Sequence, residues 1–230
     1  MKDFISSSLF FCVLLTVGSY LFGDWLKKKF RFRIINGMII AIVICIGTVL
    51  LLKIDLGTYQ DATKVLNFFL TPATVCLAIP LYKQFEKLKS NWPAILGGIV
   101  SGVLANLFCV FGLSLLLKIG HKEYVSLLPK SITTAIGLAL SEEYGGLIPI
   151  TMAMIVITGN LGNIFAEVWC KIFGIKDSVA RGVAIGTSSH VLGTTKAMEM
   201  GEVEGAMSSL SIAVCGVLTV VGAQFFTNLI

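Results

Sequence analysis

Long apolar stretches separated by short polar ones make up most of this sequence. A helix needs roughly 20 mostly apolar residues to cross a bilayer, and four stretches meet this length with few polar residues: 4–22, 34–52, 93–117 and 208–230. Residues 147–173 also qualify, although they include Asn160, Asn163 and Glu167. Residues 65–82 are shorter and contain two prolines, which predicts a kinked span. The pattern predicts an all-α polytopic membrane protein with about six spanning helices.

The composition supports the membrane class and argues against several others. Hydrophobic residues make up 56% of the chain and charged residues only 13%, whereas soluble proteins have about 25% charged residues. The net charge of +5 is spread over short loops, which argues against a nucleic-acid partner. The six cysteines lie in apolar stretches without a CxxC pair, so we expect no metal site and no cofactor. No HExxH, GxSxG or phosphate-binding loop is present, and we expect no enzyme activity.

The basic residues predict how the chain is oriented. The loop KKKFRFR between the first two apolar stretches should lie in the cytoplasm, which places the N-terminus outside. We expect a single membrane domain over residues 1–230, with N-terminal spans in residues 5–92 and a C-terminal part in residues 93–230.

Two polar segments of the C-terminal part, residues 127–146 and 182–205, are too irregular to be ordinary spans. If both enter and leave on one side, most basic residues lie in the cytoplasm; if both cross as broken helices, the basic residues divide equally. The positive-inside rule therefore favours re-entrant segments, and crossing by broken helices remains the alternative.

The two polar segments resemble each other in sequence. Thr133-Thr134 corresponds to Thr194-Thr195, and Glu142-Glu143 corresponds to Glu202 and Glu204. One predicted span separates the two copies, so the second copy would be inverted relative to the first. Paired, interrupted segments in inverted copies are typical of a transporter site near the bilayer midplane, although segments this short and simple also match by chance.

The polar side chains of both segments are candidates for binding a small carboxylate. Hydroxyl groups and the N-termini of half-helices can bind its oxygen atoms, and a lysine can attract its charge. The candidate substrate-binding residues are Lys130, Ser131, Thr133, Thr134, Ser189, His190, Thr194, Thr195 and Lys196. The candidates for a pathway or for coupling are Asn160, Asn163, Glu143 and Glu202. Charged groups cost about 2.5–3.5 kcal/mol at the bilayer centre, so we expect the charged candidates to face a cavity or an interface.

Each candidate also has a purely structural interpretation. Serine and threonine in helices often donate to the carbonyl four residues earlier, and lysines can extend to the membrane surface. His190 is either a packed, neutral residue or a proton acceptor near physiological pH. The glutamates fit ordinary interfacial carboxylates. Gly97, Gly98, Gly102 and the glycines of GNLGN (residues 159–163) are typical of close helix packing.

Two motifs carry a resemblance to a known family. PKS-TT and G-SSH-LGT--A-E-GE-EGA-S resemble the signatures of the LrgB/CidB family of bacterial membrane proteins. The resemblance covers about residues 5–228. The chain departs from the family where Ala135 stands in place of a proline that relatives often carry after the threonine pair.

The resemblance implies two functions. One is transport of small monocarboxylates such as pyruvate or glycolate, which agrees with the two hydroxyl-rich segments and would be coupled to protons through a group such as His190. The other is antiholin-like modulation of murein hydrolase activity and cell lysis through protein–protein interaction. In both, the resemblance implies a multi-pass protein of the bacterial cell membrane that acts with a small holin-like protein of the LrgA/CidA type. Assembly into a homo-oligomer stays open.

Overall fold

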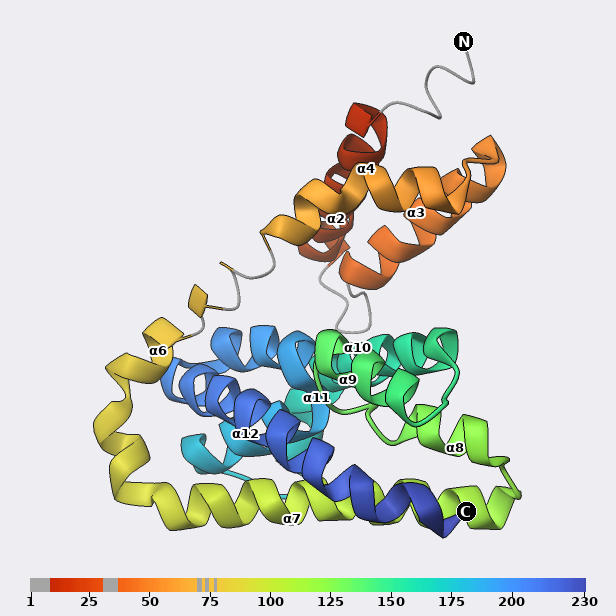
Figure 1. The fold of residues 1–230 in the computed structure, drawn as a ribbon. Helices are drawn as coiled ribbons and strands as arrows, with labels where there is room; N and C mark the ends of the chain where they lie inside the picture. The colour runs from red at the N-terminus through yellow and green to blue at the C-terminus, as the bar shows by residue number, and fades with distance from the viewer. Residues whose placement is uncertain (1–8, 31–36, 70–71, 73–74, 77) are drawn as a thin grey trace. The chain divides into compact units, whose positions relative to one another are not determined.

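Helices account for the regular structure of the part of the chain that is described. The computed structural model describes residues 9–30, 37–69, 72, 75–76 and 78–230. Its main helices are α2 (Leu9–Phe30), α3 (Gly37–Leu52), α4 (Leu56–Phe68), α6 (Ala78–Lys83), α7 (Phe85–Leu117), α8 (His121–Leu127), α9 (Thr134–Glu143), α10 (Ile148–Ile172), α11 (Ser178–Met200) and α12 (Glu202–Phe226), followed by the short η1 (Thr227–Leu229) (Figure 1). The predicted all-α class is confirmed.

Four helices are long and apolar enough to cross a membrane, namely Phe10–Lys29, Lys89–Leu117, Ile148–Ile172 and Glu202–Leu229. They correspond to four of the predicted spans, and Gly37–Leu52 is a shorter apolar helix of 16 residues. The chain is therefore a polytopic helical membrane protein. Residues 4–8 and 34–36 of the predicted spans lie outside the described residues, as does most of the FRFR part of the basic loop.

The region predicted as one kinked span, residues 65–82, is described only in part, so the kinked span stays a prediction. Helix α4 ends at Phe68 and α6 begins at Ala78, and residues 70, 71, 73, 74 and 77 lie outside the described residues. Helix α4 begins at Leu56, nine residues before the predicted span, in a polar sequence that contains Gln60, Asp61 and Lys64. An apolar window that starts at residue 65 therefore missed most of this helix, because the window follows hydropathy and not helix propensity.

Contacts divide the chain into two compact units, Met1–Cys76 and Leu77–Ile230. In the first unit, α2 packs against α3 and α4, and the hydroxyls of Thr16 and Tyr59 share a hydrogen bond of 2.6 Å. Helix α2 continues to Phe30, eight residues beyond its predicted end, and an ion pair of 2.7 Å between Asp24 and Lys28 supports this last part. The prediction of a single membrane domain stays a prediction.

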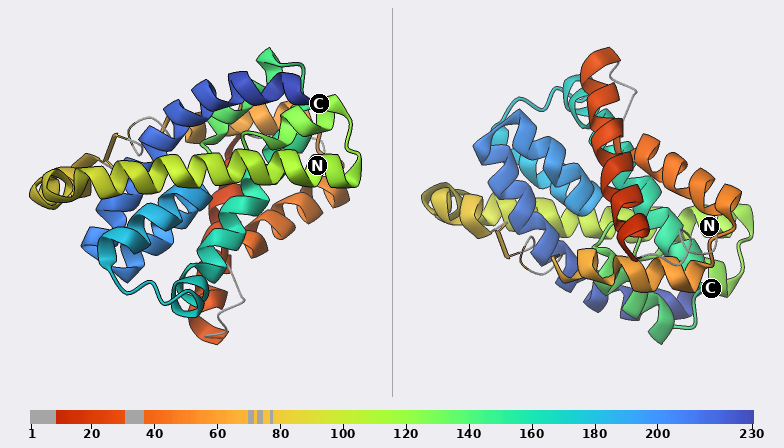
Figure 2. Two further views of the ribbon diagram at one scale, coloured as in Figure 1. Left: turned by 90° about the horizontal axis from the view of Figure 1, so that it is seen from below. Right: turned by 90° about the horizontal axis from the view of Figure 1, so that it is seen from above.

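The second unit is built around α7, α11 and α12. Helix α7 has 33 residues and packs against both α11 and α12 (Figure 2). Ile95, Ile99, Val103 and Leu107 recur every four residues along one face of α7 and are buried with Met207 of α12. At the far end, the buried hydroxyl of Tyr124 donates to the Phe226 carbonyl at 2.9 Å, and burial raises the pKa of Tyr124 to about 12. This phenol therefore stays protonated and anchors α8 to the end of α12.

Candidate functional site

Both predicted polar segments contain a break in their helical structure. In the first segment α8 ends at Leu127 and α9 begins at Thr134, and turns connect them. In the second segment α11 is interrupted at His190, whose backbone angles are φ 42° and ψ −140°. Positive φ favours glycine and is strained for other residues, so the surrounding contacts must hold His190 in this conformation.

The ring of His190 is fixed by helix α10. Its Nε2 atom lies 2.9 Å from the carbonyl oxygen of Ile155, and the residue is only 4% exposed. A Cβ atom at Gly159 would lie 2.6 Å from Cε1 of the ring. Gly159 therefore provides the space that the ring fills, and the histidine joins the break in α11 to α10.

We expect His190→Ala to lower the free energy of unfolding by about 1–3 kcal/mol, because it removes a buried hydrogen bond to the Ile155 carbonyl and leaves the space beside Gly159 unfilled. Thermal unfolding of the purified protein would measure the change. His121→Ala is the matched control, since the His121 ring is bonded to the Ile230 carbonyl at 2.7 Å but is exposed. Equal loss in both variants would contradict the role assigned to His190.

Glycines bring α7 and α10 close to α11 along its first half. An added Cβ at Gly162 would collide with the Ser189 side chain, and one at Gly102 would lie 2.6 Å from Cγ2 of Thr187. Gly98 faces Val183 at 3.2 Å in the same way. The predicted packing role is confirmed for these glycines and for Gly159, whereas it is wrong for Gly97, which faces open space.

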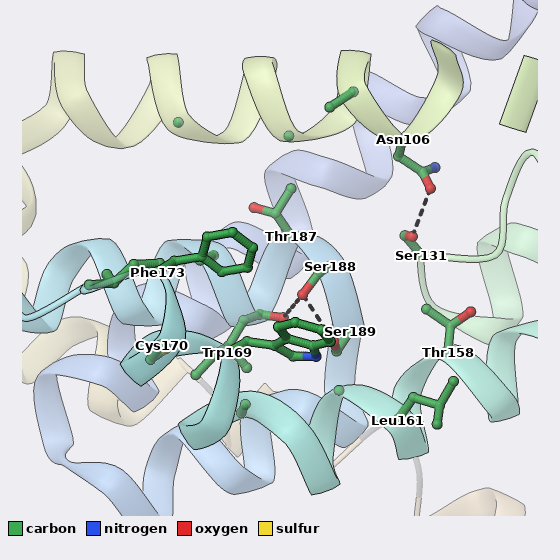
Figure 3. Close-up of a pocket in the computed structure, with 18 of the residues that line it drawn as sticks. Asn106, Ser131, Thr158, Leu161, Trp169, Cys170, Phe173, Thr187, Ser188 and Ser189 are labelled. Carbon is green, nitrogen blue, oxygen red and sulfur yellow. Dashed lines mark hydrogen bonds between the residues drawn. The ribbon is translucent and has the colours of Figure 1, made fainter. Parts of the chain in front are cut away.

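A pocket of about 790 Å³ lies where the two broken segments meet α7 and α10 (Figure 3). Helix α7 contributes small residues and Asn106, the break between α8 and α9 contributes Lys130 and Ser131, and α11 contributes residues 184, 185 and 187–189. Helix α10 and the turn after it contribute Thr158, Leu161, Gly162, Ala166, Trp169, Cys170, Phe173 and Ile175. The break regions predicted from sequence therefore do come together at one cavity.

Lys130 is held at one end of this pocket by Asn106 and Ser131. Its Nζ atom donates to Asn106 Oδ1 at 2.5 Å and to Ser131 Oγ at 3.3 Å, and Ser131 Oγ donates to the same Asn106 oxygen at 3.2 Å. Among the described residues that line the pocket, Lys130 alone carries a charge. Its ammonium has three donors and, among the described carboxylates, no partner within 4.0 Å. We call Asn106, Lys130 and Ser131 the polar end; it suits an anion.

Three hydroxyl residues of α11 lie farther along the pocket wall. Ser188 and Ser189 share a hydrogen bond of 3.0 Å, and Ser188 also donates to the Ile185 carbonyl at 3.3 Å. Thr187 is 6% exposed, and its hydroxyl has no hydrogen-bond partner among the described residues. Buried hydroxyls normally have partners, so Thr187 carries a buried donor without a partner among the described residues, and it would reach a ligand only after its side chain turns toward the pocket.

Three of the nine predicted substrate-binding residues line this pocket: Lys130, Ser131 and Ser189. The others lie elsewhere. Thr133 and Thr134 form the start of α9, where the Thr133 side chain makes no capping hydrogen bond. Thr194 is buried and bonds to the His190 carbonyl at 2.9 Å and to the Ser208 hydroxyl at 2.7 Å, so it joins α11 to α12. Thr195 bonds to Leu192 and Asn163.

The structure separates the two candidate lysines. Lys196 forms ion pairs with Glu167 at 2.7 Å and with Glu199 at 3.1 Å. Its charge is therefore already balanced by two carboxylates, whereas Lys130 has two neutral acceptors. Lys130 is accordingly the stronger candidate for attracting an anion.

The predicted pathway residues also lie outside the pocket lining. Asn160 donates to the Val156 carbonyl at 2.8 Å, and Asn163 donates to the Leu192 carbonyl at 2.8 Å. Glu143 and Glu202 are exposed. Their contribution to a pathway or to coupling stays a prediction.

Asn106 and Thr187 are the main polar residues that the sequence reasoning missed. Asn106 is an amide within an apolar span, four residues after Gly102, and it lies on the same face of α7 as Gly98 and Gly102. A polar residue on the small-residue face of a membrane helix is a usable signal. Thr187 precedes the SSH motif directly and differs from its neighbours only in its unpaired hydroxyl, which no sequence pattern reveals.

Comparison with known proteins decides the family. The model of the LrgB-like family matches residues 16–229. The chain belongs to the LrgB-like family. It is 34% identical to the antiholin-like protein LrgB of Bacillus subtilis (strain 168) over 224 residues, which is 97% of each chain. It is 35% identical over 218 residues to the antiholin-like protein LrgB of Bacillus cereus (strain B4264), covering 94% of this chain and 95% of the relative.

The LrgB-like match includes both helix breaks and every residue that lines the pocket. The resemblance seen in the PKS-TT and SSH motifs is thereby confirmed as family membership. No solved structure matches the chain.

Proposed function

We propose that this LrgB-like chain transports small monocarboxylates, such as pyruvate or glycolate, across the bacterial cell membrane. The observation that carries the proposal is Lys130, which, among the described residues, has no carboxylate partner and is the one charged residue that lines the pocket. A half-buried ammonium without a carboxylate partner among the described residues favours an anionic ligand. The Thr187 hydroxyl can donate to a carboxylate oxygen once it turns toward the ligand, and the Ser131 and Ser189 hydroxyls can do so by exchanging their present acceptors for the ligand.

The helix breaks support a carrier more than a passive scaffold. Discontinuous helices that meet at a central site are typical of secondary transporters. Here Lys130 and Ser131 come from one break, and Ser188 and Ser189 directly precede the other, at His190. Movement of either half-helix would therefore change the pocket, which is what alternating access requires.

We further propose that the carrier works with a small holin-like subunit of the LrgA/CidA type, that its N-terminus lies outside, and that uptake is driven by protons. Support for the partner comes from the family resemblance, and support for the orientation comes from Lys27, Lys28 and Lys29 at the end of α2. We also propose that the chain forms a homo-oligomer and that His190 takes part in proton coupling. No nucleic acid, metal or cofactor enters it.

Thr187 offers a test that separates ligand binding from stability. We expect Thr187→Val to leave the free energy of unfolding unchanged or slightly raised, because the hydroxyl it removes has no partner. We expect the KM for uptake to rise by about threefold to tenfold through loss of one ligand hydrogen bond.

Thr194→Val is the matched control, since it removes a buried hydroxyl with two partners. It should lower the free energy of unfolding by about 1–3 kcal/mol. Thermal unfolding and uptake kinetics of both variants give the comparison. A Thr187→Val protein with normal KM would remove this hydroxyl from the site.

A second function, modulation of cell lysis through protein–protein interaction, has support of its own. The curated relatives are named antiholin-like proteins. Large apolar side chains such as Leu116 of α7 and Phe225 of α12 are exposed, and such surfaces fit either lipid or a partner helix. In this case the pocket would have no ligand.

Uptake of labelled pyruvate and glycolate into proteoliposomes distinguishes the two functions. The vesicles contain the chain with and without its small partner, under an inward proton gradient. Gradient-dependent accumulation above that of empty vesicles would support the carrier. Normal partner pull-down together with no uptake of any small carboxylate would instead favour the modulator.

A further inference from the structure

The pocket is much larger than a three-carbon acid. Its volume is about 790 Å³, within the range of roughly 300–1,000 Å³ that takes drug-sized ligands. At the roughly 30 Å³ that a water molecule occupies in the liquid, the six non-hydrogen atoms of pyruvate would need about 180 Å³. A carboxylate bound at Lys130 would therefore leave most of the pocket unfilled.

The lining changes in character along the pocket. Figure 3 shows Asn106 and Ser131 at one end and Cys170 and Phe173 toward the other, with Thr187, Ser188, Ser189 and the ring of Trp169 in the middle. The rings of Trp169 and Phe173 stack with centroids 5.9 Å apart and an interplanar angle of 27°. Although both rings line the pocket, they are 52% and 71% exposed. We call Trp169, Cys170 and Phe173 the aromatic end.

The space and the lining point to one chemical class of ligand. We propose that the pocket binds monocarboxylates that carry an apolar tail, with the carboxylate at the polar end and the tail against Trp169 and Phe173. The inference rests on the proposed transport function and extends its substrates to acids longer than pyruvate, which should bind more tightly than pyruvate does. The tail removes apolar surface of both ligand and protein from water, which favours binding.

Other ligand classes fit the lining less well. A dicarboxylate would place its second charge near the aromatic end, where none of the described lining residues is charged. A sugar acid would place several hydroxyls there, and Trp169, Cys170 and Phe173 supply few partners for them. Alkyl alcohols or amines would leave Lys130 without a counter-charge. Only a single carboxylate followed by an apolar chain uses both ends.

Binding of a homologous series of acids tests the inference on the wild-type protein. The full chain, in nanodiscs of a single phospholipid, is titrated with straight-chain and 2-oxo acids of two to six carbons by calorimetry, with empty nanodiscs as the blank. We expect the affinity to rise about fourfold with each added methylene that becomes buried. Alcohols of the same lengths should bind far more weakly, which separates the pocket from general lipid partitioning.

Two variants locate the tail. Trp169→Ala and Phe173→Ala should flatten the dependence of the affinity on chain length, so that the longest acids lose the most affinity. Trp92→Ala and Phe165→Ala are the matched controls, because these side chains are exposed and do not line the pocket; they should retain the full dependence.

The outcomes separate this inference from the proposed function. Binding of short acids without any gain on lengthening would overturn the inference and leave carboxylate transport intact. Binding of no acid at any length, by a folded protein, would overturn both. A gain with length that is equal in alcohols, or equal in Trp169→Ala, would assign the effect to lipid and also overturn the inference.

Discussion

Lys130→Gln should abolish carboxylate uptake while the protein remains folded. Glutamine retains a donor for Asn106 but removes the one charge among the described residues that line the pocket. Loss of one member of a desolvated, hydrogen-bonded charge pair costs about 2–5 kcal/mol, so we expect kcat/KM for uptake to fall by at least about thirtyfold. Uptake of labelled pyruvate into proteoliposomes measures the effect.

Two companion variants make this prediction specific. Lys122→Gln removes an exposed lysine of α8 that does not line the pocket, and it should transport normally. Lys130→Arg keeps the positive charge but replaces the compact ammonium with a planar guanidinium, so it should retain part of the uptake activity. Normal uptake by a folded Lys130→Gln protein would rule out this lysine as the anion site.

Gly162→Ala should disrupt the contact between α10 and α11. The added methyl would overlap the Ser189 side chain next to the break at His190, and overpacking of this kind costs about 1–3 kcal/mol. We expect a lower unfolding temperature and, because Ser189 lines the pocket, a loss of uptake that exceeds the loss of folded protein. Thermal unfolding and uptake at matched protein amounts measure the two effects.

The controls for this variant come from the same chain. Gly97 and Gly112 lie within α7 and face open space, so Gly97→Ala and Gly112→Ala should leave stability unchanged or raise it by roughly 0.5–1 kcal/mol. If Gly162→Ala behaved like these two, the close approach of α10 and α11 would be contradicted.

Hydropathy predicted most of the fold because bilayer thickness constrains helix length directly. For α7, α10 and α12, at least one end of the predicted span lies within a few residues of the end of the observed helix. Helix α4 was missed because it is helical without being apolar. Each helix break lies in one of the two polar segments that the sequence indicated. Polar residues between long apolar helices are uncommon unless they line a cavity or an interface.

The site was predicted less completely than the fold. The repeated threonine pairs suggested equivalent roles, but Thr194 bonds to α12 while Thr133 directly precedes α9. A sequence repeat shows that side-chain types recur, and it does not show which way each side chain points after a break. Asn106 was missed because its contact with Lys130 joins residues 24 positions apart, and sequence spacing gives no information on such pairs.

Protection of Cys109 by carboxylates would test the central claim most directly. Cys109 is exposed and lines the pocket on the same helix as Asn106. In a variant that keeps Cys109 as its single cysteine, the rate of labelling by an anionic thiol reagent is measured with and without saturating pyruvate or a longer monocarboxylate. The account predicts several-fold slower labelling with the carboxylate, and no such protection when Lys130→Gln is added. Equal labelling rates, in a protein that still takes up the same carboxylate, would contradict the account and place the substrate elsewhere.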